Sequence, residues 1–356
     1  MNEQAFTGVR VLDFSQVLAG PFATQLMAQL GAQVIKVEQP VGGDMTRGLM
    51  SASSDGMAPS FLAANLGKRS LTLDLKNPKA KEVVHKLVAE ADVLVENFKP
   101  GTIERLGFGF DAMKAIKPDL VYASISGFGQ TGPRANLPAF DGAIQAYSGM
   151  MSISGHAETG PVRSGYFSVD MSTALNAAFA ITAALLRRAN TGEGQRVDVS
   201  MLDTAIFMQS PQMTGYLVTG KAPELNGNAS PTKQPTSNVF ASSNGYVQVI
   251  AMKETQVQAL FTELGMPERY AEFNEPTVRL ARRDEVHSLI APIIAAETTE
   301  YWLETLDSIG VPVSAIQDFP AIAEEPQLAH REVFIEQAHH LYPNQSVKVV
   351  RAAHVA

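Results

Sequence analysis

Asp170 is the residue of this chain whose position most clearly suggests a chemical role. It directly precedes residues 171–186, MSTALNAAFAITAALL, which are 16 uncharged residues and the most apolar stretch of the sequence. Aspartate at a helix start accepts hydrogen bonds from backbone N–H groups, so the spacing alone predicts an N-cap. A helix N-terminus also favours the ionised form of a carboxyl group, so a cap and a chemical role are compatible.

A second set of candidate residues follows a short apolar segment at 92–96. These residues are Asn97, Phe98, Lys99 and Arg105. Lysine and arginine at the carboxyl ends of parallel strands can hold a phosphate group. A turn with solvated charges explains the same residues and is the commoner arrangement. Other cations of the N-terminal third available to an anionic ligand are Lys36, Arg47, Lys68, Arg69 and Lys76.

Other kinds of chemistry find less support. Residues 127–132, GFGQTG, fit G-x-G-x-x-G, but the following residues do not resemble the start of a helix. A nicotinamide dinucleotide site at the first turn, LAGP, would use Glu38 as the ribose ligand and would need three glycines in that turn. The turn lacks these glycines, so we predict no nicotinamide cofactor. The chain has no cysteine, and its seven histidines lack metal-ligand spacing, so we predict no metal site.

The elements that must position these residues alternate between strands and helices. Residues 9–38 read as strand, helix and strand, and a glycine-rich loop follows. A strand around 71–75, a helix capped by Asn77-Pro78, a strand at 92–96 and a strand at 119–125 come next. Strands separated by helices predict a parallel, doubly wound, Rossmann-like sheet of the α/β class. Open sheets of this class bind ligands at the carboxyl ends of their strands.

The chain is predicted to contain two domains. Residues 1–220 form the large Rossmann-like domain, and residues 326–356 return to it. The segment 220–238 is rich in Gly, Pro, Ser, Thr and Asn, which is typical of a loop or linker. Beyond it, strand patterns at 246–252 and 311–316 enclose three amphipathic helical patterns, so residues 225–325 are predicted to form a small α/β domain.

Composition narrows the functional classes. The net charge of −8 argues against a nucleic-acid partner, which requires a basic surface. The segment 171–186 is shorter than the roughly 20 residues that a bilayer requires, so we predict a buried core helix and no membrane partner. The first ten residues lack an apolar signal core, and the absence of cysteine fits a reducing compartment, so we predict a cytoplasmic location.

An ordered series of motifs resembles the family III CoA-transferases, which include formyl-CoA and carnitine-CoA transferases and are related to 2-methylacyl-CoA racemases. The matching motifs run from residue 9 to about residue 240. They are VLDFSQVLAGP, LGAQVIKVEQP, GGDMTRG, NLGKRSLTLDLK, VLVENFKPGTIERLG, SISGFGQTGP, PAFDGAIQAYSG and TGEGQRVDVSMLD. Each motif alone is weak evidence, and their order along the chain makes the resemblance specific.

The resemblance implies an activity and a set of site residues. Asp170 stands at the place of the catalytic aspartate, whose carboxylate attacks an acyl-CoA thioester to form an acyl-aspartyl anhydride. CoA or acyl-CoA is then a substrate, and a carboxylic acid is the acceptor. The implied CoA-contacting positions are Leu18, Ala19, Gln39, Leu73, Lys76, Asn97, Phe98, Lys99, Arg105, Phe140 and Asp141.

Three of these positions bear on specificity. Formyl-CoA transferases carry glutamine in place of Leu18 and arginine in place of Gln39, so both residues argue against oxalate and formate as the substrate pair. The racemases carry a proton-transferring histidine in place of Phe140. Phenylalanine cannot transfer a proton, which disfavours racemisation.

The resemblance predicts a CoA-transferase of the class that transfers sulfur-containing groups, and an interlocked homodimer. One alternative is an acyl-CoA racemase or isomerase of the same fold. Another is a CoA-binding protein without turnover, because the Gly-x-His-Thr motif usual near the family's C-terminus is missing from this sequence. The segment 227–238 corresponds to the family's active-site lid, and an ordinary interdomain linker explains it as well.

Overall fold

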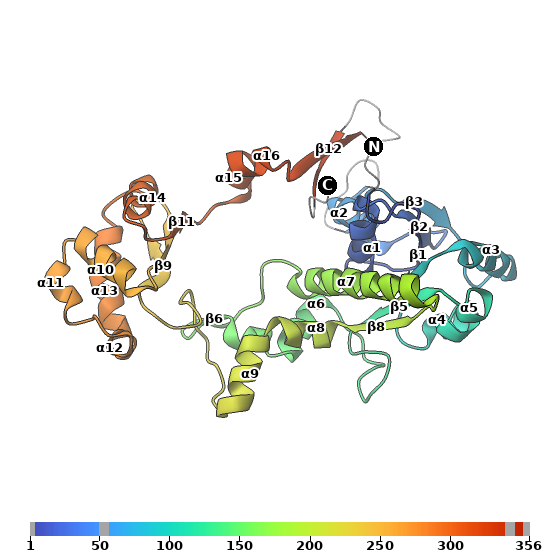
Figure 1. Ribbon diagram of the computed structural model, residues 1–356, viewed down its shortest axis with the longest axis horizontal. Coiled ribbons are helices and arrows are strands. Elements are labelled where there is room, and N and C mark those ends of the chain that lie inside the picture. The colour runs from blue at the N-terminus through green and yellow to red at the C-terminus, as the bar shows by residue number, and fades with distance from the viewer. Residues whose placement is uncertain (1–3, 50–56, 339–345, 352–356) are drawn as a thin grey trace. The chain divides into compact units, whose positions relative to one another are not determined.

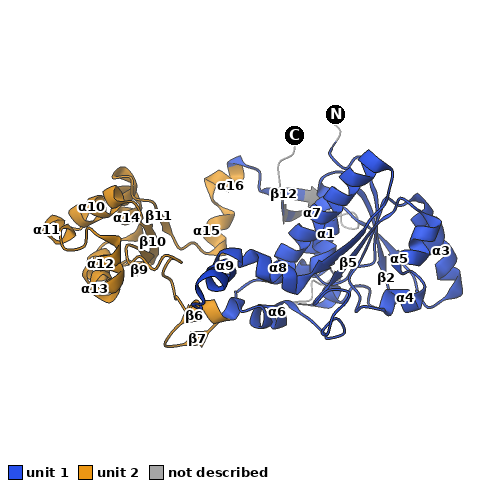
Figure 2. Cartoon of the chain, turned by 60° about the horizontal axis from the view of Figure 1, so that its bottom comes forward, with its two compact units in different colours: residues 1–151, 163–222, 330–356 blue, residues 152–162, 223–329 orange. Residues whose placement is uncertain are grey.

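The computed structural model describes residues 4–49, 57–338 and 346–351. The chain divides into two compact units (Figure 2). Unit 1 comprises residues 1–151, 163–222 and 330–356, and unit 2 comprises residues 152–162 and 223–329. The segment 152–162 thus belongs to unit 2, although the sequence analysis assigned it to the large domain.

Within the described part of unit 1, a six-stranded parallel sheet has the order β3-β2-β1-β4-β5-β8 (Figure 1). Its strands are β1 (Arg10–Asp13), β2 (Gln33–Glu38), β3 (Arg69–Thr72), β4 (Val93–Glu96), β5 (Val121–Ser126) and β8 (Arg196–Ser200). Counted within the sheet, the order is 3-2-1-4-5-6, the order of doubly wound nucleotide-binding sheets. The predicted α/β class with a parallel sheet is confirmed. The order reverses between β1 and β4, where such sheets form a ligand crevice.

Alternate residues of the central strands contribute to two hydrophobic cores. Val11, Val93 and Val121 pack on one face of the sheet, whereas Leu12 and Leu94 pack on the other. Both β4 and β5 are buried along their whole length, as expected for strands covered on two faces. The central strands are therefore packed on both faces up to the carboxyl ends that present the candidate residues.

Helices cover both faces of this sheet. α1 (Ala19–Gln29) and α7 (Ser168–Thr191) lie side by side on one face (Figure 1), and α3 (Pro78–Glu90) and α5 (Phe110–Ile116) contribute to the core of the other. Asn77 caps α3 as predicted, with its side chain accepting a bond from the Lys79 N–H. The other helices of unit 1 are η1 (Met45–Gly48), α2 (Pro59–Asn65), α4 (Thr102–Leu106), α6 (Asp141–Tyr147), α8 (Met201–Met208) and α9 (Ser210–Thr219).

α7 has the length and apolar composition of a membrane span. Its small residues Ala174, Ala177 and Ala184 are nevertheless buried in the core that it shares with α1. The prediction of a buried core helix is thus correct for one face of α7. The other face is exposed, with Leu175 at 58% and Phe179 at 73% of full accessibility.

Unit 2 is built around a three-stranded antiparallel sheet in its described residues, with the order β11-β10-β9. Its long helices α10, α13 and α14 coincide with the three predicted amphipathic patterns, and Phe261, Ile290 and Trp302 pack in its core. The elements are β6 (Gly155–His156), β7 (Gly160–Pro161), β9 (Ser237–Ala241), β10 (Tyr246–Ile250), α10 (Glu254–Glu263), α11 (Pro267–Tyr270), α12 (Pro276–Ala281), α13 (Arg283–Ile294), α14 (Thr299–Ser308), β11 (Val313–Ala315) and α15 (Phe319–Ala323).

Two elements cross the unit boundaries, namely η2 (Met150–Ile153) and α16 (Pro326–His330), and the hairpin of β12 (Phe334–Ala338) and β13 (Ser346–Val350) belongs to unit 1. The hairpin contacts α1 through a bond from the Gln29 side chain to the Val350 carbonyl oxygen, 3.2 Å. Residues 339–345 and 352–356 of the predicted returning segment lie outside the described residues. The loop 227–238 lies in unit 2, where the Gly227 N–H donates to the Gly155 carbonyl oxygen.

Candidate active site

A cavity of about 320 Å³ lies at the carboxyl ends of β1, β4 and β5. It occupies the position where the strand order reverses, as predicted for a sheet of this class. Seven predicted site residues line it, namely Leu18, Ala19, Asn97, Phe98, Lys99, Phe140 and Asp170. The cavity therefore collects residues that are far apart in the sequence around one aspartate.

Asp170 lies in the first turn of α7, partly buried, and its carboxylate faces a weakly solvating environment. Burial, together with the negative charge of Asp141, raises the pKa of the Asp170 carboxyl from 3.8 to about 7. Among the described residues, no hydrogen-bond donor or cation pairs with this carboxylate. A carboxylate that is neither neutralised nor hydrogen-bonded is more basic and thus a better nucleophile than an ordinary one.

The N-cap predicted for Asp170 is wrong, because Asp141 performs that function. One carboxylate oxygen of Asp141 accepts bonds from the N–H groups of Val169 at 2.8 Å and Asp170 at 3.1 Å. Gln145 donates to the other oxygen at 2.6 Å. Asp141 is 5% exposed and sits 29 residues before Asp170, so a distant segment caps α7. The Asp170 side chain is thereby left available for chemistry.

The loop between β1 and α1 brings backbone groups to the same cavity. Val17 has a φ of 69°, in the left-handed region that β-branched residues rarely adopt. Its N–H donates to the carboxylate of Asp44 at 3.2 Å, and Asn97 exchanges two bonds with the backbone of Gln16, at 2.8 and 2.7 Å. Strain of this kind persists only where surrounding contacts impose it, and it concentrates at functional sites.

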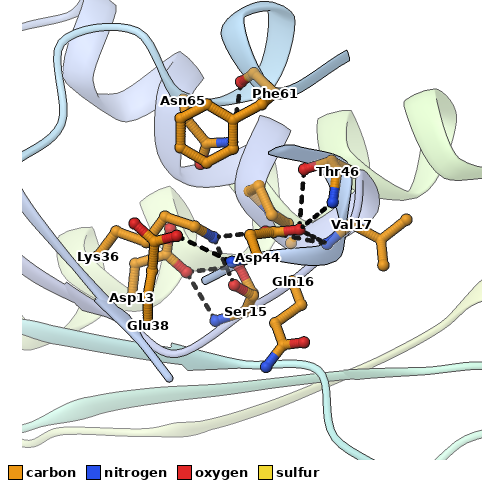
Figure 3. Close-up of polar contacts among 12 residues, drawn as sticks. Asp13, Ser15, Gln16, Val17, Lys36, Glu38, Asp44, Thr46, Phe61 and Asn65 are labelled. Carbon is orange, nitrogen blue, oxygen red and sulfur yellow. Dashed lines mark hydrogen bonds and ion pairs between the residues drawn. The ribbon is translucent and has the colours of Figure 1, made fainter. Parts of the chain in front are cut away.

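A network of buried ion pairs and hydrogen bonds fixes the loop between β1 and α1 (Figure 3). Asp44 forms an ion pair with Lys36 at 2.9 Å. It also accepts hydrogen bonds from the N–H of Val17 and from the N–H and hydroxyl of Thr46. Lys36 also donates to the Ser15 carbonyl oxygen at 2.7 Å. Both charged side chains are almost fully buried and neutralise each other, and the neighbouring buried charges of Asp13 and Lys68 also act on them.

A second buried pair joins Lys68 to Asp13 at 3.0 Å, and Arg47 pairs with Glu38 at 2.7 Å. Burial alone raises the pKa of Asp13, but Lys68 and the neighbouring donors lower it to about 2. Burial lowers the pKa of Lys68 to about 8, so both groups are charged at neutral pH. Of the seven cations considered above for an anionic ligand, Lys36, Arg47 and Lys68 therefore serve the protein's own carboxylates. Arg69, Lys76, Lys99 and Arg105 remain exposed.

Five predicted site residues do not line the cavity. Gln39, Lys76 and Arg105 are exposed, Leu73 packs at the edge of a core, and Asp141 is buried beneath α7. Phe140 does line it, with 65% of its surface exposed, so the core packing that could otherwise explain this residue is not observed.

Ser126 and Val17 also line the cavity, although neither was among the predicted site residues. Ser126 ends β5, so the strand-end rule that selected Asn97 could have found it as well. Nothing in the sequence marks Val17, because a left-handed turn is normally signalled by glycine.

The described residues contain no group of three His, Asp or Glu side chains that could hold a metal ion. Glu38, the hypothetical ribose ligand, is engaged by Arg47 and Ser70, at 2.7 Å each. The cavity thus presents the Asp170 carboxylate and the exposed side chain of Lys99.

Comparison with known proteins assigns this arrangement to a family. An acetyl-CoA:oxalate CoA-transferase of Acetobacter aceti is 36% identical over 97% of this chain and 89% of its own length. A succinyl-CoA:mesaconate CoA-transferase of Haloarcula marismortui is 37% identical over 93% of this chain and 85% of its own. The crystal structure of a CAIB/BAIF family protein from Brucella suis superposes with a TM-score of 0.89 at 33% identity, covering 100% of this chain and 93% of that one. Because the model of CoA-transferase family III also matches residues 6–355, the chain belongs to CoA-transferase family III.

Proposed function

We propose that this CoA-transferase moves CoA from an acyl-CoA thioester to a free carboxylic acid through covalent intermediates on Asp170. The observation that carries the proposal is the Asp170 carboxylate, which faces the cavity at the sheet's switch point without a donor or cation among the described residues. Its raised pKa supports the assignment, because a more basic carboxylate attacks a thioester more readily.

The reaction balances without water or a general base. A carboxylate oxygen of Asp170 bonds to the acyl carbon, the C–S bond breaks, and CoA leaves as the thiolate, giving an acyl-aspartyl anhydride. The thiolate then attacks the aspartyl carbonyl and releases the donor acid, leaving an aspartyl-CoA thioester. The acceptor carboxylate attacks this thioester to form a second anhydride. The thiolate finally takes the new acyl group and restores the Asp170 carboxylate.

The exposed cations beyond β3 and β4 support a path for the CoA phosphates. Lys99 lines the cavity itself, Arg105 lies on α4, and Lys76 follows β3. Each stands at the carboxyl side of the sheet, where an anionic ligand approaches Asp170. We assign the pantetheine end of CoA to the β1–α1 loop, at Leu18 and Ala19.

Phe140 favours transfer over racemisation. Phe140 lines the same cavity as Asp170 and stands at the position where the resemblance places a racemase histidine. Moving an α-proton between two faces requires a group able to accept and return it, and a phenyl ring does neither. The aspartate therefore acts as a nucleophile in this proposal.

Exposed apolar side chains on unit 1 support the proposed homodimer. They are Leu175, Phe179 and Leu186 on α7, Phe207 on α8, and Leu217 and Val218 on α9, each between 58% and 79% exposed. Apolar groups gathered on consecutive helices are typical of an interface. A molar mass of one chain by light scattering, at micromolar concentration, would contradict this part of the proposal.

The covalent mechanism is tested by intact-protein mass spectrometry. The enzyme is mixed with acetyl-, formyl-, succinyl- or glutaryl-CoA, and the adduct is located by peptide mapping. We expect an acyl or CoA adduct on Asp170 with at least one donor, and none in Asp170→Asn. An adduct elsewhere, or transfer by the Asn variant, refutes the mechanism. Binding without any adduct or transfer would favour the alternative of a CoA-binding protein without turnover.

The phosphate path is tested by calorimetric titration with free CoA at low salt. Lys99→Ala should weaken binding several-fold, and the difference should shrink as salt is added, because the lost contact is ionic. Lys86→Ala, an exposed lysine of α3, is the matched control. Equal dissociation constants for the two variants would place the phosphates elsewhere.

A further inference from the structure

Three strands of the parallel sheet end in a buried carboxyl group. Asp13 ends β1, Glu38 ends β2 and Glu96 ends β4, and each residue is at most 4% exposed. The first pairs with Lys68 and the second with Arg47. Glu96 forms no ion pair within the described residues. Its carboxyl group is therefore not there to neutralise a buried cation.

Glu96 instead holds the backbone of the turn that follows β4. Its Oε2 accepts a hydrogen bond from the N–H of Phe98, two residues further on, at 2.9 Å. Glu96 alternates with Leu94 along β4, so its side chain lies on the face of the sheet opposite α7. Burial raises the pKa of the Glu96 carboxyl to about 7, although Ser124 and the Phe98 N–H lower it. The hydrogen bond thus reaches the turn from the core, outside the cavity that contains Asp170.

The turn carries three residues of the candidate site. Asn97, Phe98 and Lys99 all line the cavity. Asn97 exchanges hydrogen bonds of 2.8 and 2.7 Å with the backbone of Gln16, so it joins the turn to the loop between β1 and α1. The Lys99 carbonyl oxygen accepts a bond from the N–H of Thr102, the first residue of α4, at 3.0 Å. The backbone course of residues 97–99 therefore decides where these side chains lie in the cavity.

Building on the proposed function, we infer that Glu96 is a positioning residue, whose hydrogen bond to the Phe98 N–H places residues 97–99 for the binding of CoA. Glu96 itself does not line the cavity, so it acts through the turn and not on the reacting atoms. Loss of the bond should weaken the binding of ground state and transition state alike. The expected signature is a raised KM with little change in kcat.

The test compares two substitutions of Glu96. Glu96→Ala removes the acceptor, whereas Glu96→Gln keeps a carbonyl oxygen that can accept from the Phe98 N–H. By calorimetric titration with free CoA, we expect Glu96→Ala to bind about 5- to 10-fold more weakly than wild type. Glu96→Gln should bind within about twofold of wild type. The control is Val84→Ala, a fully buried residue of the same core that does not line the cavity, and it should bind CoA as wild type does.

Rates of adduct formation on Asp170 under single turnover give the second readout. At saturating acyl-CoA, Glu96→Ala should react at nearly the wild-type rate. The acyl-CoA concentration for half the maximal rate should rise by the same factor as the dissociation constant of free CoA. A fall in the saturated rate with unchanged CoA affinity would overturn the assignment, because Glu96 would then act on the chemical step.

The other outcomes also decide the question. Wild-type affinity in Glu96→Ala overturns the role of Glu96, and so does an equal loss in Val84→Ala, because the effect would then come from core packing. Equal losses in the Ala and Gln variants would assign the effect to the charge and not to the hydrogen bond. Should Glu96→Ala not fold, amide hydrogen exchange decides. Protection of the Phe98 amide in wild type and in Glu96→Gln supports the role, and exchange at the rate of an unprotected peptide overturns it. A wild-type enzyme that neither binds CoA nor forms an adduct on Asp170 refutes the proposed function itself.

Discussion

Replacing Asp170 by asparagine should stabilise the protein at pH 8 while it abolishes transfer. The substitution keeps the size of the side chain and removes its charge. Among the described residues it breaks no hydrogen bond or ion pair of the carboxylate. Because the cap of α7 is Asp141, the helix also keeps its N-terminal contacts. The difference in the free energy of unfolding between the two proteins therefore reports the cost of keeping the Asp170 carboxylate charged in this cavity.

The magnitude follows from the raised pKa. A rise from 3.8 to about 7 gives an upper limit of about 4 kcal/mol, at about 1.4 kcal/mol per pKa unit. Asp170 keeps some contact with water, so we expect roughly 1–2 kcal/mol at pH 8. Because the folded pKa is the higher one, wild-type stability falls as pH rises from about 4 through 7. The advantage of the Asn variant should thus be largest at pH 8 and smaller at pH 5.

Urea unfolding followed by far-ultraviolet circular dichroism, at pH 5 and pH 8, measures this difference. Fluorescence is less suitable, since the single tryptophan, Trp302, lies in unit 2. Asp111→Asn is the control, because Asp111 is an exposed aspartate in the first turn of α5. Equal stability of Asp170→Asn and wild type at both pH values would show that the carboxylate is solvated. Asp170 would then not be an activated nucleophile.

Three further predictions address neighbouring residues. Asp141→Asn removes the charge that helps to raise the pKa of Asp170, so the pH profile of adduct formation should move to lower pH. An unchanged pH profile would contradict this coupling. With Phe140 in the cavity, wild-type enzyme without an acceptor acid should not exchange the α-proton of a 2-methylacyl-CoA in heavy water, and rapid exchange seen by NMR would restore the racemase alternative. Asp44→Asn leaves the buried Lys36 without its ion-pair partner and should lower the free energy of unfolding in urea by about 3–5 kcal/mol. Part of this loss should be recovered in the double variant Asp44→Leu, Lys36→Met. A cost below about 1 kcal/mol for the single variant would show that the pair is solvated.

The sequence predicted the fold well where local pattern determines structure. The strands β1, β2, β4 and β5 and the cap at Asn77 follow from apolar runs and from residues adjacent in the chain. The cavity was expected at the strand ends, because sheets of this class place ligands there.

The unpredicted features depend on contacts between distant segments. The bond of Asp141 to the start of α7 spans 29 residues, and that of Asp44 to Val17 spans 27. A lysine available to a phosphate and a lysine buried against a carboxylate look alike in sequence, so the role of Lys36 could be read only from its surroundings.

In the loop between β1 and α1, the contacts that fix the backbone are distinct from the side chains that line the cavity. Every contact described above that fixes residues 15–17 acts on a backbone atom, through Lys36 at the Ser15 carbonyl, Asn97 at Gln16 and Asp44 at the Val17 N–H. The side chains of Gln16, Val17 and Leu18 are then free to change without loss of the frame. We therefore expect that variation at these positions can change the preferred acid in single steps, whereas the buried charged residues must change together. Such a division would let one scaffold serve relatives named for acids as different as oxalate and mesaconate.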